Sequence, residues 1–219
     1  MSIRLRWSQF SHRSRAGVTA LALAAGVAFQ AGCTSTQTDG VSPSYLIIDS
    51  LAAASGAQPD EFGGTLASDV ITFVDTGVGA KSATVFSDLA QVTFSLGLKD
   101  PGSANSPSQP STSNFITVNR YRVVFIRADG RNTPGVDVPF GFDGAVTVTV
   151  GGSGATANLT LVRIQAKEEA PLRALRNNGG AQAISTIAEV TFYGQDQAGR
   201  EVSVVGRISV NFADWGDPS

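Results

Sequence analysis

Few side chains of this chain are suited to nucleophilic or general-base catalysis. The 219 residues include one histidine, His12, and one cysteine, Cys33. Beyond Cys33 the chain therefore lacks the residues of a Ser-His-Asp or Cys-His nucleophilic site, of a histidine general base and of an ordinary His/Cys zinc site. With no second cysteine, it also has no intrachain disulfide, and its stability must come from the core.

Carboxylates are the remaining candidates for chemistry. Glu168 and Glu169 are the material for a glycosidase-like acid–base pair, but adjacent carboxylates at the start of a helix more simply complement its dipole. One glycine-rich loop holds four oxygen-bearing side chains of the kind that bind Ca²⁺: Asp129, Asn132, Asp137 and Asp143. The stretch does not match the regular calcium loop, and such residues also stabilise turns. We favour turns, and we expect no metal, no cofactor and no enzyme activity.

Three aromatic residues are candidates for ligand binding. Phe140 and Phe142 flank Gly141 and are suited to an exposed platform for a sugar or a partner. Aromatic residues that alternate at the mouth of a strand also serve as core plugs under a loop. Trp215 follows the last predicted strand, where it either closes one end of the core or contacts a ligand.

Residues 1–32 have the pattern of an export signal. Four arginines and no acidic residue precede a small and apolar run from Ala16 to Ala31. A basic head, an apolar middle and small residues before the cleavage point are typical of such signals. The run has 16 residues, fewer than the ~20 that span a bilayer as a helix.

The end of this run, Ala31-Gly32-Cys33, resembles the lipobox of bacterial lipoproteins, although Gln30 stands where that family usually has Leu. The resemblance implies that Cys33 is acylated, palmitate being the typical acyl chain, and becomes the new N-terminus. It also implies an outer-membrane location, facing the periplasm or the cell surface, because Thr34 follows the cysteine in place of Asp.

The alternative is ordinary signal cleavage, for example after Gly26 with Ala24 at the small −3 position, which leaves Cys33 as a free thiol. We favour the lipoprotein because it accounts for a lone cysteine in an exported chain. Acyl chains stabilise membrane attachment by about 0.8 kcal/mol per buried CH₂ group.

The rest of the chain divides into a tether and one domain. Residues 33–44 are polar and aperiodic, which predicts a lipidated, flexible tether, and residues 45–219 suit a single domain. Beyond Cys33 the chain has 12 Lys and Arg against 18 Asp and Glu, a net charge of −6. This charge argues against nucleic acid or an anionic lipid surface as the main partner.

Alternation of apolar and polar residues predicts several half-buried strands. The clearest runs from Ala90 to Leu98. A long strand from Phe115 to Ala128 changes the parity of its apolar residues near Arg120, which predicts a bulge or a change of sheet there. Further strands are predicted from Val146 to Val150 and from Leu159 to Ala166, the second as the antiparallel return of the first.

Other segments have weaker signals. Tyr45 to Asp49 and Leu66 to Val74 are predicted strands, and the alanine-rich stretch from Leu51 to Ala54 is suited to a helical turn. Glu168 to Gly180 is predicted as a short helix, with Pro171 at an early position and a glycine as its stop.

The strongest folding signal is a hairpin near the end of the chain. Its strands cover residues 188–193 and 201–212, with Gly206 at a position where strands commonly bend or bulge. Tyr193 and the turn from Asp196 to Gly199 resemble the last two strands of bacterial immunoglobulin-like and fibronectin-III-like modules. We therefore predict an all-β fold, an antiparallel β-sandwich of the immunoglobulin-like kind, with at most one short helix.

Together these observations predict a membrane-anchored exported lipoprotein that acts as a non-enzymatic interaction or structural module of the cell envelope. Its expected partners are the membrane, through the lipid, and an envelope protein, but not nucleic acid. The alternative is a lipoprotein that binds carbohydrate or calcium through loops at one end of the sandwich.

Overall fold

The computed structural model describes residues 41–77 and 79–216. The predicted signal, the lipidation site Cys33 and most of the predicted tether lie outside these residues, so the structure does not test them. These described residues form one compact unit. Within the described residues, no helix is both long enough and apolar enough to cross a membrane.

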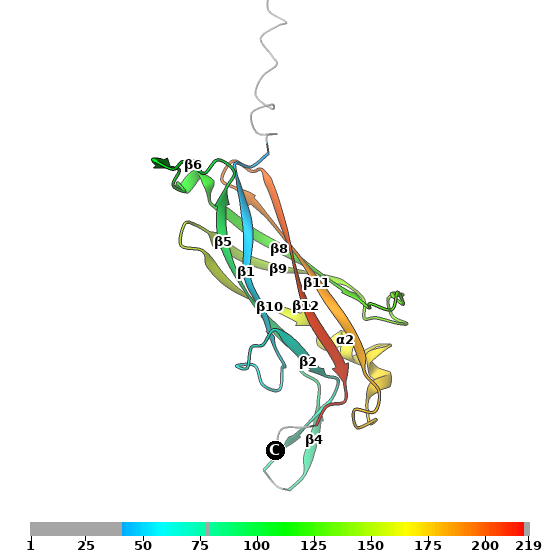
Figure 1. The fold of residues 1–219 in the computed structure, drawn as a ribbon. Helices are drawn as coiled ribbons and strands as arrows, with labels where there is room; N and C mark the ends of the chain where they lie inside the picture. Colours follow the sequence, from blue (N-terminus) through cyan, green and yellow to red (C-terminus); the bar gives the residue numbers. More distant parts are fainter. Residues whose placement is uncertain (1–40, 78, 217–219) are drawn as a thin grey trace, which may run out of the picture. The chain divides into compact units, whose positions relative to one another are not determined.

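Two β-sheets make up most of this unit (Figure 1). The first has three antiparallel strands in the order β1-β5-β10: β1 (Ser44–Ala54), β5 (Asp88–Leu98) and β10 (Ala155–Val162). The second has five strands in the order β2-β12-β11-β8-β9: β2 (Thr65–Asp69), β12 (Glu201–Ala213), β11 (Ile184–Asp196), β8 (Ile116–Ile126) and β9 (Phe142–Val150). All their pairings are antiparallel except that between β2 and β12, which is parallel.

The remaining elements are short. Two small ribbons pair β3 with β4 and β6 with β7: β3 (Thr72–Asp75), β4 (Lys81–Thr84), β6 (Gly102–Ser103) and β7 (Ser106–Pro107). The helical segments of the described residues are the 3₁₀ turns η1 (Thr112–Asn114) and η2 (Leu172–Leu175) and the α-helix α2 (Ile164–Glu168). The prediction of an all-β fold with little helix is confirmed.

The core lies between the two sheets. Phe94 of β5 meets Phe192 of β11 edge to face, with ring centroids 5.0 Å apart, and both side chains are inaccessible to solvent. The Tyr121 hydroxyl of β8 donates a hydrogen bond to the Thr160 carbonyl of β10, at 3.1 Å. These contacts join the sheets through the alternate residues of each strand, as the period-two pattern predicted.

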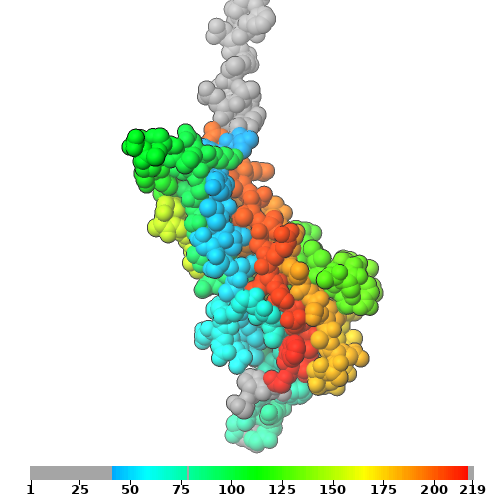
Figure 2. All heavy atoms as spheres, viewed as in Figure 1, coloured from blue at the N-terminus to red at the C-terminus, as the bar shows by residue number. Residues whose placement is uncertain are grey.

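Strands β1 and β12 lie beside each other at one side of the two sheets, as Figure 2 shows. Gly206 favours this approach, because a Cβ at that position would lie only 3.0 Å from the side-chain tips of Ile48 and Leu51. The pairing of β11 with β12 continues through Gly206 without a shift of register. Gly206 therefore provides room for β1, and the β11–β12 pairing has no bulge at this position.

The bulge predicted near Arg120 is present. The pairing of β8 with β11 shifts register between Tyr193 and Gly194, and its pairing with β9 shifts between Val118 and Arg120. Asn119 is the extra residue against β11. Val118 before the bulge and Tyr121 after it both face the core, which explains the change of parity seen in the sequence.

Three local predictions are wrong in detail. Residues 51–54 continue β1, and the predicted strand 66–74 is divided between β2 and β3. Strand β10 pairs with β5 and not with β9, so the glycine-rich turn before it carries the chain from one sheet to the other. Alternation shows which side chains face the core, but it does not identify the neighbouring strand.

The predicted helix from Glu168 to Gly180 is also wrong. Helix α2 ends at Glu168, and only the short turn η2 follows. Pro171 explains the interruption, because proline lacks a backbone N–H and disfavours helical backbone at the preceding residue.

Candidate functional site

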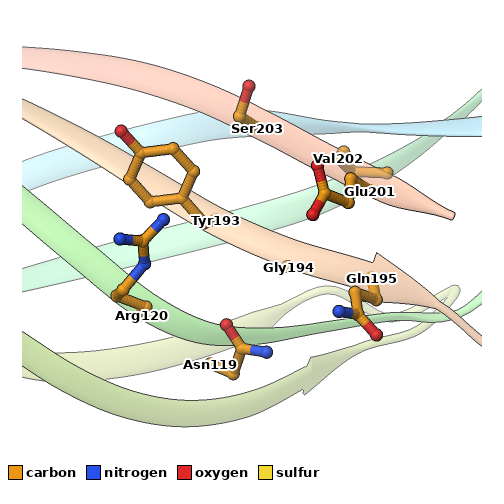
Figure 3. Close-up of a pocket in the computed structure, with 8 residues that line it drawn as sticks. All are labelled: Asn119, Arg120, Tyr193, Gly194, Gln195, Glu201, Val202 and Ser203. Atoms are coloured by element: carbon orange, nitrogen blue, oxygen red, sulfur yellow. The ribbon is translucent and has the colours of Figure 1, made fainter. Parts of the chain in front are cut away.

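An open hollow of about 550 Å³ lies over one end of the five-stranded sheet, between β8, β11 and β12 (Figure 3). The β8 bulge shapes it. In a regular strand, consecutive side chains point to opposite faces, but the bulge leaves both Asn119 and Arg120 exposed to solvent. Opposite them on β11 is Gly194, where a Cβ would lie 2.6 Å from the Thr117 carbonyl oxygen. The sequence thus provides an outward-facing polar pair beside a position with no side chain.

Polar side chains of both charge signs line the hollow. Arg120 and Tyr193 lie at one end, and Gln195 and Glu201 lie at the other (Figure 3). The Arg120 guanidinium carbon is 4.2 Å from the centroid of the Tyr193 ring, a cation–π contact worth about 0.5–1 kcal/mol at an exposed site. Arg120 Nη1 also lies 3.6 Å from Asp143 Oδ1, so the charge is held between an aromatic ring and a carboxylate.

This arrangement is suited to binding. Asn119, Gln195 and Ser203 add amide and hydroxyl groups, which donate and accept hydrogen bonds. The groups stand on paired strands, so their backbone positions are fixed before a ligand arrives. Sequence reasoning predicted the bulge at Arg120 but did not identify this hollow, because residues from β8, β11 and β12 meet only in the folded sheet.

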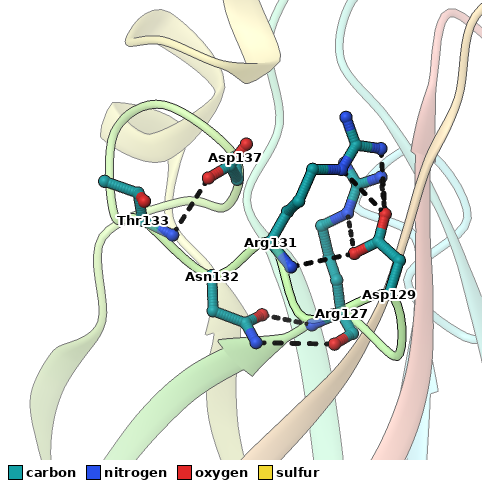
Figure 4. A network of polar contacts seen from close by, with 6 residues as sticks. All are labelled: Arg127, Asp129, Arg131, Asn132, Thr133 and Asp137. Carbon is teal, nitrogen blue, oxygen red and sulfur yellow. Dashed lines mark hydrogen bonds and ion pairs between the residues drawn. The ribbon is translucent and has the colours of Figure 1, made fainter.

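The loop considered for calcium holds its carboxylates in internal contacts (Figure 4). Asp129 accepts hydrogen bonds from both Arg127 and Arg131, at 2.7 Å and 2.9 Å for the closest pairs. These bonds hold the pKa of Asp129 far below its usual range. Asn132 Oδ1 accepts the Arg127 backbone N–H at 2.6 Å, and Asp137 Oδ2 accepts that of Thr133 at 3.2 Å.

The fourth candidate, Asp143, bonds to Arg122 Nη1 at 2.7 Å. Among the described residues, no group of three or more histidine, cysteine or acidic side chains has the spacing of a metal site. In the structure, these four residues make turn and ion-pair contacts.

The three aromatic candidates do not come together. Phe140 is 50% exposed, whereas Phe142 is only 7% exposed. The Phe142 ring meets Tyr121 edge to face and is covered by the Arg163 guanidinium at 4.2 Å, so Phe142 is a core plug and the two phenylalanines form no exposed pair. Trp215 is 37% exposed, and its Nε1 donates to the Asn211 carbonyl at 3.3 Å.

Phe140 precedes β9, and Trp215 follows β12 beside β2, so these two residues belong to opposite edges of the five-stranded sheet. Ligand binding by Phe140 or by Trp215 stays a prediction. Neither residue lines the hollow over the β8 bulge.

The Glu168-Glu169 pair is at the end of α2 and not at the start of a helix. Glu168 Oε1 lies 2.8 Å from Arg176 Nη2, and this hydrogen bond lowers the pKa of Glu168. Glu169 accepts a hydrogen bond from the Gln165 amide at 2.9 Å. Each carboxylate therefore has its own structural partner.

A buried charged cluster was missed by sequence reasoning. Lys167 Nζ lies 2.8 Å from Asp88 Oδ1, with side chains 1% and 0% exposed. The Gly56 N–H donates to the same oxygen at 2.9 Å, and the Ser68 hydroxyl donates to Oδ2 at 2.6 Å. Asp88 is two residues before Ala90 and so lies on the same, buried face of β5. This spacing is the signal in the sequence that could have revealed a buried carboxylate.

Asp69 lies next to Ser68 in this region and is also buried. Burial raises the pKa of Asp69 above its ordinary value of 3.8. Hydrogen bonds oppose the rise, chiefly one from the Thr72 hydroxyl at 2.7 Å and one from the Trp215 N–H at 3.1 Å, and Lys167 opposes it through its charge. Trp215 thus helps to hold the end of β12 against β2.

Comparison with protein families and with curated proteins assigns no family to the chain. No protein-family model matches the chain. No curated protein matches it significantly.

Proposed function

We propose that this chain is an exported, lipid-anchored protein that acts as a non-enzymatic interaction module of the cell envelope, with an immunoglobulin-like sandwich as its folded body. The sequence supports export and anchoring through the signal-like residues 1–32 and Cys33. The two facing sheets and the β11–β12 hairpin support the sandwich.

The open hollow over the β8 bulge is the observation that carries the interaction role. Arginine and tyrosine are enriched among the residues that dominate binding energy at protein interfaces, and Arg120 lies against Tyr193 at one end of this hollow. Its mixed charges and hydrogen-bonding groups suit a polar segment of an envelope protein. The negative charge of the chain beyond Cys33 makes nucleic acid an unsuitable partner.

The chain enters the folded unit at the same end as the hollow, which favours a partner close to the membrane. Ser42 is buried near the end of β11, where its side chain helps to lower the pKa of Asp196, the last residue of that strand. The hollow residues Gln195 and Glu201 flank the same β11–β12 turn. Eight residues beyond Cys33 reach at most about 28 Å when extended. An acyl anchor at Cys33 would therefore keep this end of the unit near the bilayer.

The anchor is tested by metabolic labelling with a fatty acid and by membrane fractionation of wild type and Cys33→Ser. We expect label and membrane association in the wild type and neither in the variant. Thr34→Ala is the matched control and should behave as wild type. An unlabelled wild type would refute acylation and leave ordinary signal cleavage.

The interaction is tested by capture from detergent-solubilised envelope, with wild type, Arg120→Ala and Tyr193→Ala as baits. We expect wild type to retain one protein that both variants lose. Arg207→Ala is the control, because it removes an exposed arginine of β12 that pairs with Glu189 away from the hollow. Equal capture by all four baits would exclude the hollow as the interface.

Carbohydrate binding is the second candidate, favoured by the amide and hydroxyl groups of Asn119, Gln195 and Ser203 in the hollow. A glycan that raises the melting temperature in a saturable manner, with the shift lost in Arg120→Ala, would favour this function over a protein partner. A shift that persists in that variant would exclude the hollow as the sugar site.

A further inference from the structure

Lys167 and Asp88 form an ion pair that solvent does not reach. Burial of two charges carries a desolvation penalty that mutual attraction often fails to offset. The Asp88 carboxylate is also held by two other donors, the Gly56 N–H and the Ser68 hydroxyl. An amine and a carboxyl group are thus kept in contact, in fixed orientation and away from water.

We propose that Lys167 and Asp88 are joined by an intramolecular isopeptide bond, which forms without any other protein or cofactor. Reaction between two groups of one folded chain has an effective molarity far above that of free reactants, up to about 10⁵–10⁸ M in well-oriented cases. The amide product carries no charge, so the reaction also removes the cost of burying the pair.

The groups around Asp88 are suited to each step. Lys167 Nζ first transfers a proton to Oδ1 across their 2.8 Å contact, which yields a neutral amine and a carboxylic acid. The amine nitrogen then attacks the Asp88 carboxyl carbon, and negative charge develops on Oδ2. The Ser68 hydroxyl donates to Oδ2 at 2.6 Å and stabilises that charge as an oxyanion-hole donor does.

The leaving group is Oδ1. It takes a second proton from the attacking nitrogen and departs as water when the C–Oδ1 bond breaks. The nitrogen keeps its third proton as the amide N–H, and Oδ2 becomes the amide carbonyl oxygen. The balance is one ammonium and one carboxylate to one amide and one water, with no oxidation or reduction.

The surroundings support this chemistry. Asp69 of β2 is the neighbouring acid, and burial raises its pKa, with Lys167 among the charges that act on it. Ser68 and Asp69 are 0% and 8% exposed, so the region is poorly solvated. The bond would join the start of β5 to α2 across 79 positions of sequence, in a chain with no disulfide.

The test is trypsin digestion of the purified wild-type protein followed by peptide mass spectrometry. Free Lys167 is a cleavage site, and its linear peptides are 164–167, 168–173 and 82–99. We expect instead one branched peptide that joins 82–99 to 164–173, lighter by one water than the sum of its two chains. Its detection does not depend on how the N-terminus is processed.

Two variants accompany the wild type. Lys167→Met with Asp88→Leu replaces the pair by apolar groups and should yield a linear peptide 82–99. Lys99→Met alters an exposed lysine near the end of β5 and should keep the branch, with the first chain extended to the next cleavage site. Linear peptides 82–99 and 164–167 as the only products of folded wild type would overturn the proposal.

Discussion

Phe94 lies at the centre of the core, where its ring contacts Phe192 from the opposite sheet. We predict that Phe94→Ala lowers the free energy of unfolding by about 3–5 kcal/mol, because truncation removes buried area and leaves a cavity. The measurement is equilibrium unfolding of wild type and variant in denaturant. The slope of the unfolding free energy against denaturant concentration should be the same in both proteins.

Thr93 is the matched control for Phe94. It precedes Phe94 in β5 and points to the opposite face of the strand. Its hydroxyl lies 3.2 Å from that of Thr156. Thr93→Ala should cost less than about 1 kcal/mol. Equal losses in the two variants would contradict the assignment of Phe94 to the only buried face of β5.

Asp69 should make stability depend on pH in the direction opposite to a salt-bridged carboxylate. Its pKa is raised in the folded state by burial, so as the pH rises above 3.8 the unfolded carboxyl loses its proton first. The folded state then binds more protons than the unfolded state, and this group's contribution to stability falls as pH rises through the interval.

The measurement for Asp69 is the free energy of unfolding of wild type and Asp69→Asn across that pH interval. The wild type should lose stability relative to the variant as pH rises. If the wild type instead gains stability relative to the variant as pH rises, the hydrogen bonds from Thr72 and Trp215 outweigh burial in their effect on the pKa of Asp69.

At the scale of elements, β12 connects two parts of the larger sheet. It pairs with β11 along its full length and with β2 over its last residues, and it buries Ile208, Val210 and Phe212. A fragment of residues 41–199 lacks this strand. We predict that it is insoluble, because the apolar rows and the edges of β11 and β2 are exposed to other chains.

The control for that deletion is a fragment of residues 41–216, which keeps β12 and should be soluble and melt cooperatively. Solubility in lysate and thermal unfolding by circular dichroism compare the two. Cooperative melting of the fragment 41–199 would mean that β12 is an appendage to an independent fold.

At the scale of the whole molecule, charge and anchor have separate effects. Residues 41–219 contain 12 basic and 17 acidic side chains, a net charge of −5. We predict that a protein of these residues alone does not sediment with vesicles of anionic lipid, because its net charge repels them. Attachment by acyl chains should instead survive high salt, since it rests on burial of CH₂ groups.

Vesicles of neutral lipid are the control in that sedimentation. Binding of residues 41–219 to the anionic vesicles alone, weakened by added salt, would show that a local basic surface attaches the protein to membranes. Such a result would contradict the prediction from net charge and would leave acylation at Cys33 to be judged separately.

The pattern of residues along the chain determined most of the strands and their buried faces. The alternation from Ala90 to Leu98, the terminal hairpin and the parity change at Arg120 all correspond to features of the structure. The physical reason is that a strand turns successive side chains to opposite faces. The alternation of apolar and polar residues therefore shows which side chains are buried.

Only the tertiary structure decided which strands are neighbours and which distant groups meet. The pairing of β10 with β5, the parallel pairing of β2 with β12 and the contact of Lys167 with Asp88 join residues far apart in sequence. No local pattern encodes these choices, because they depend on how both sheets fill the core together. The hollow beside Arg120 and the burial of Phe142 follow from the same packing.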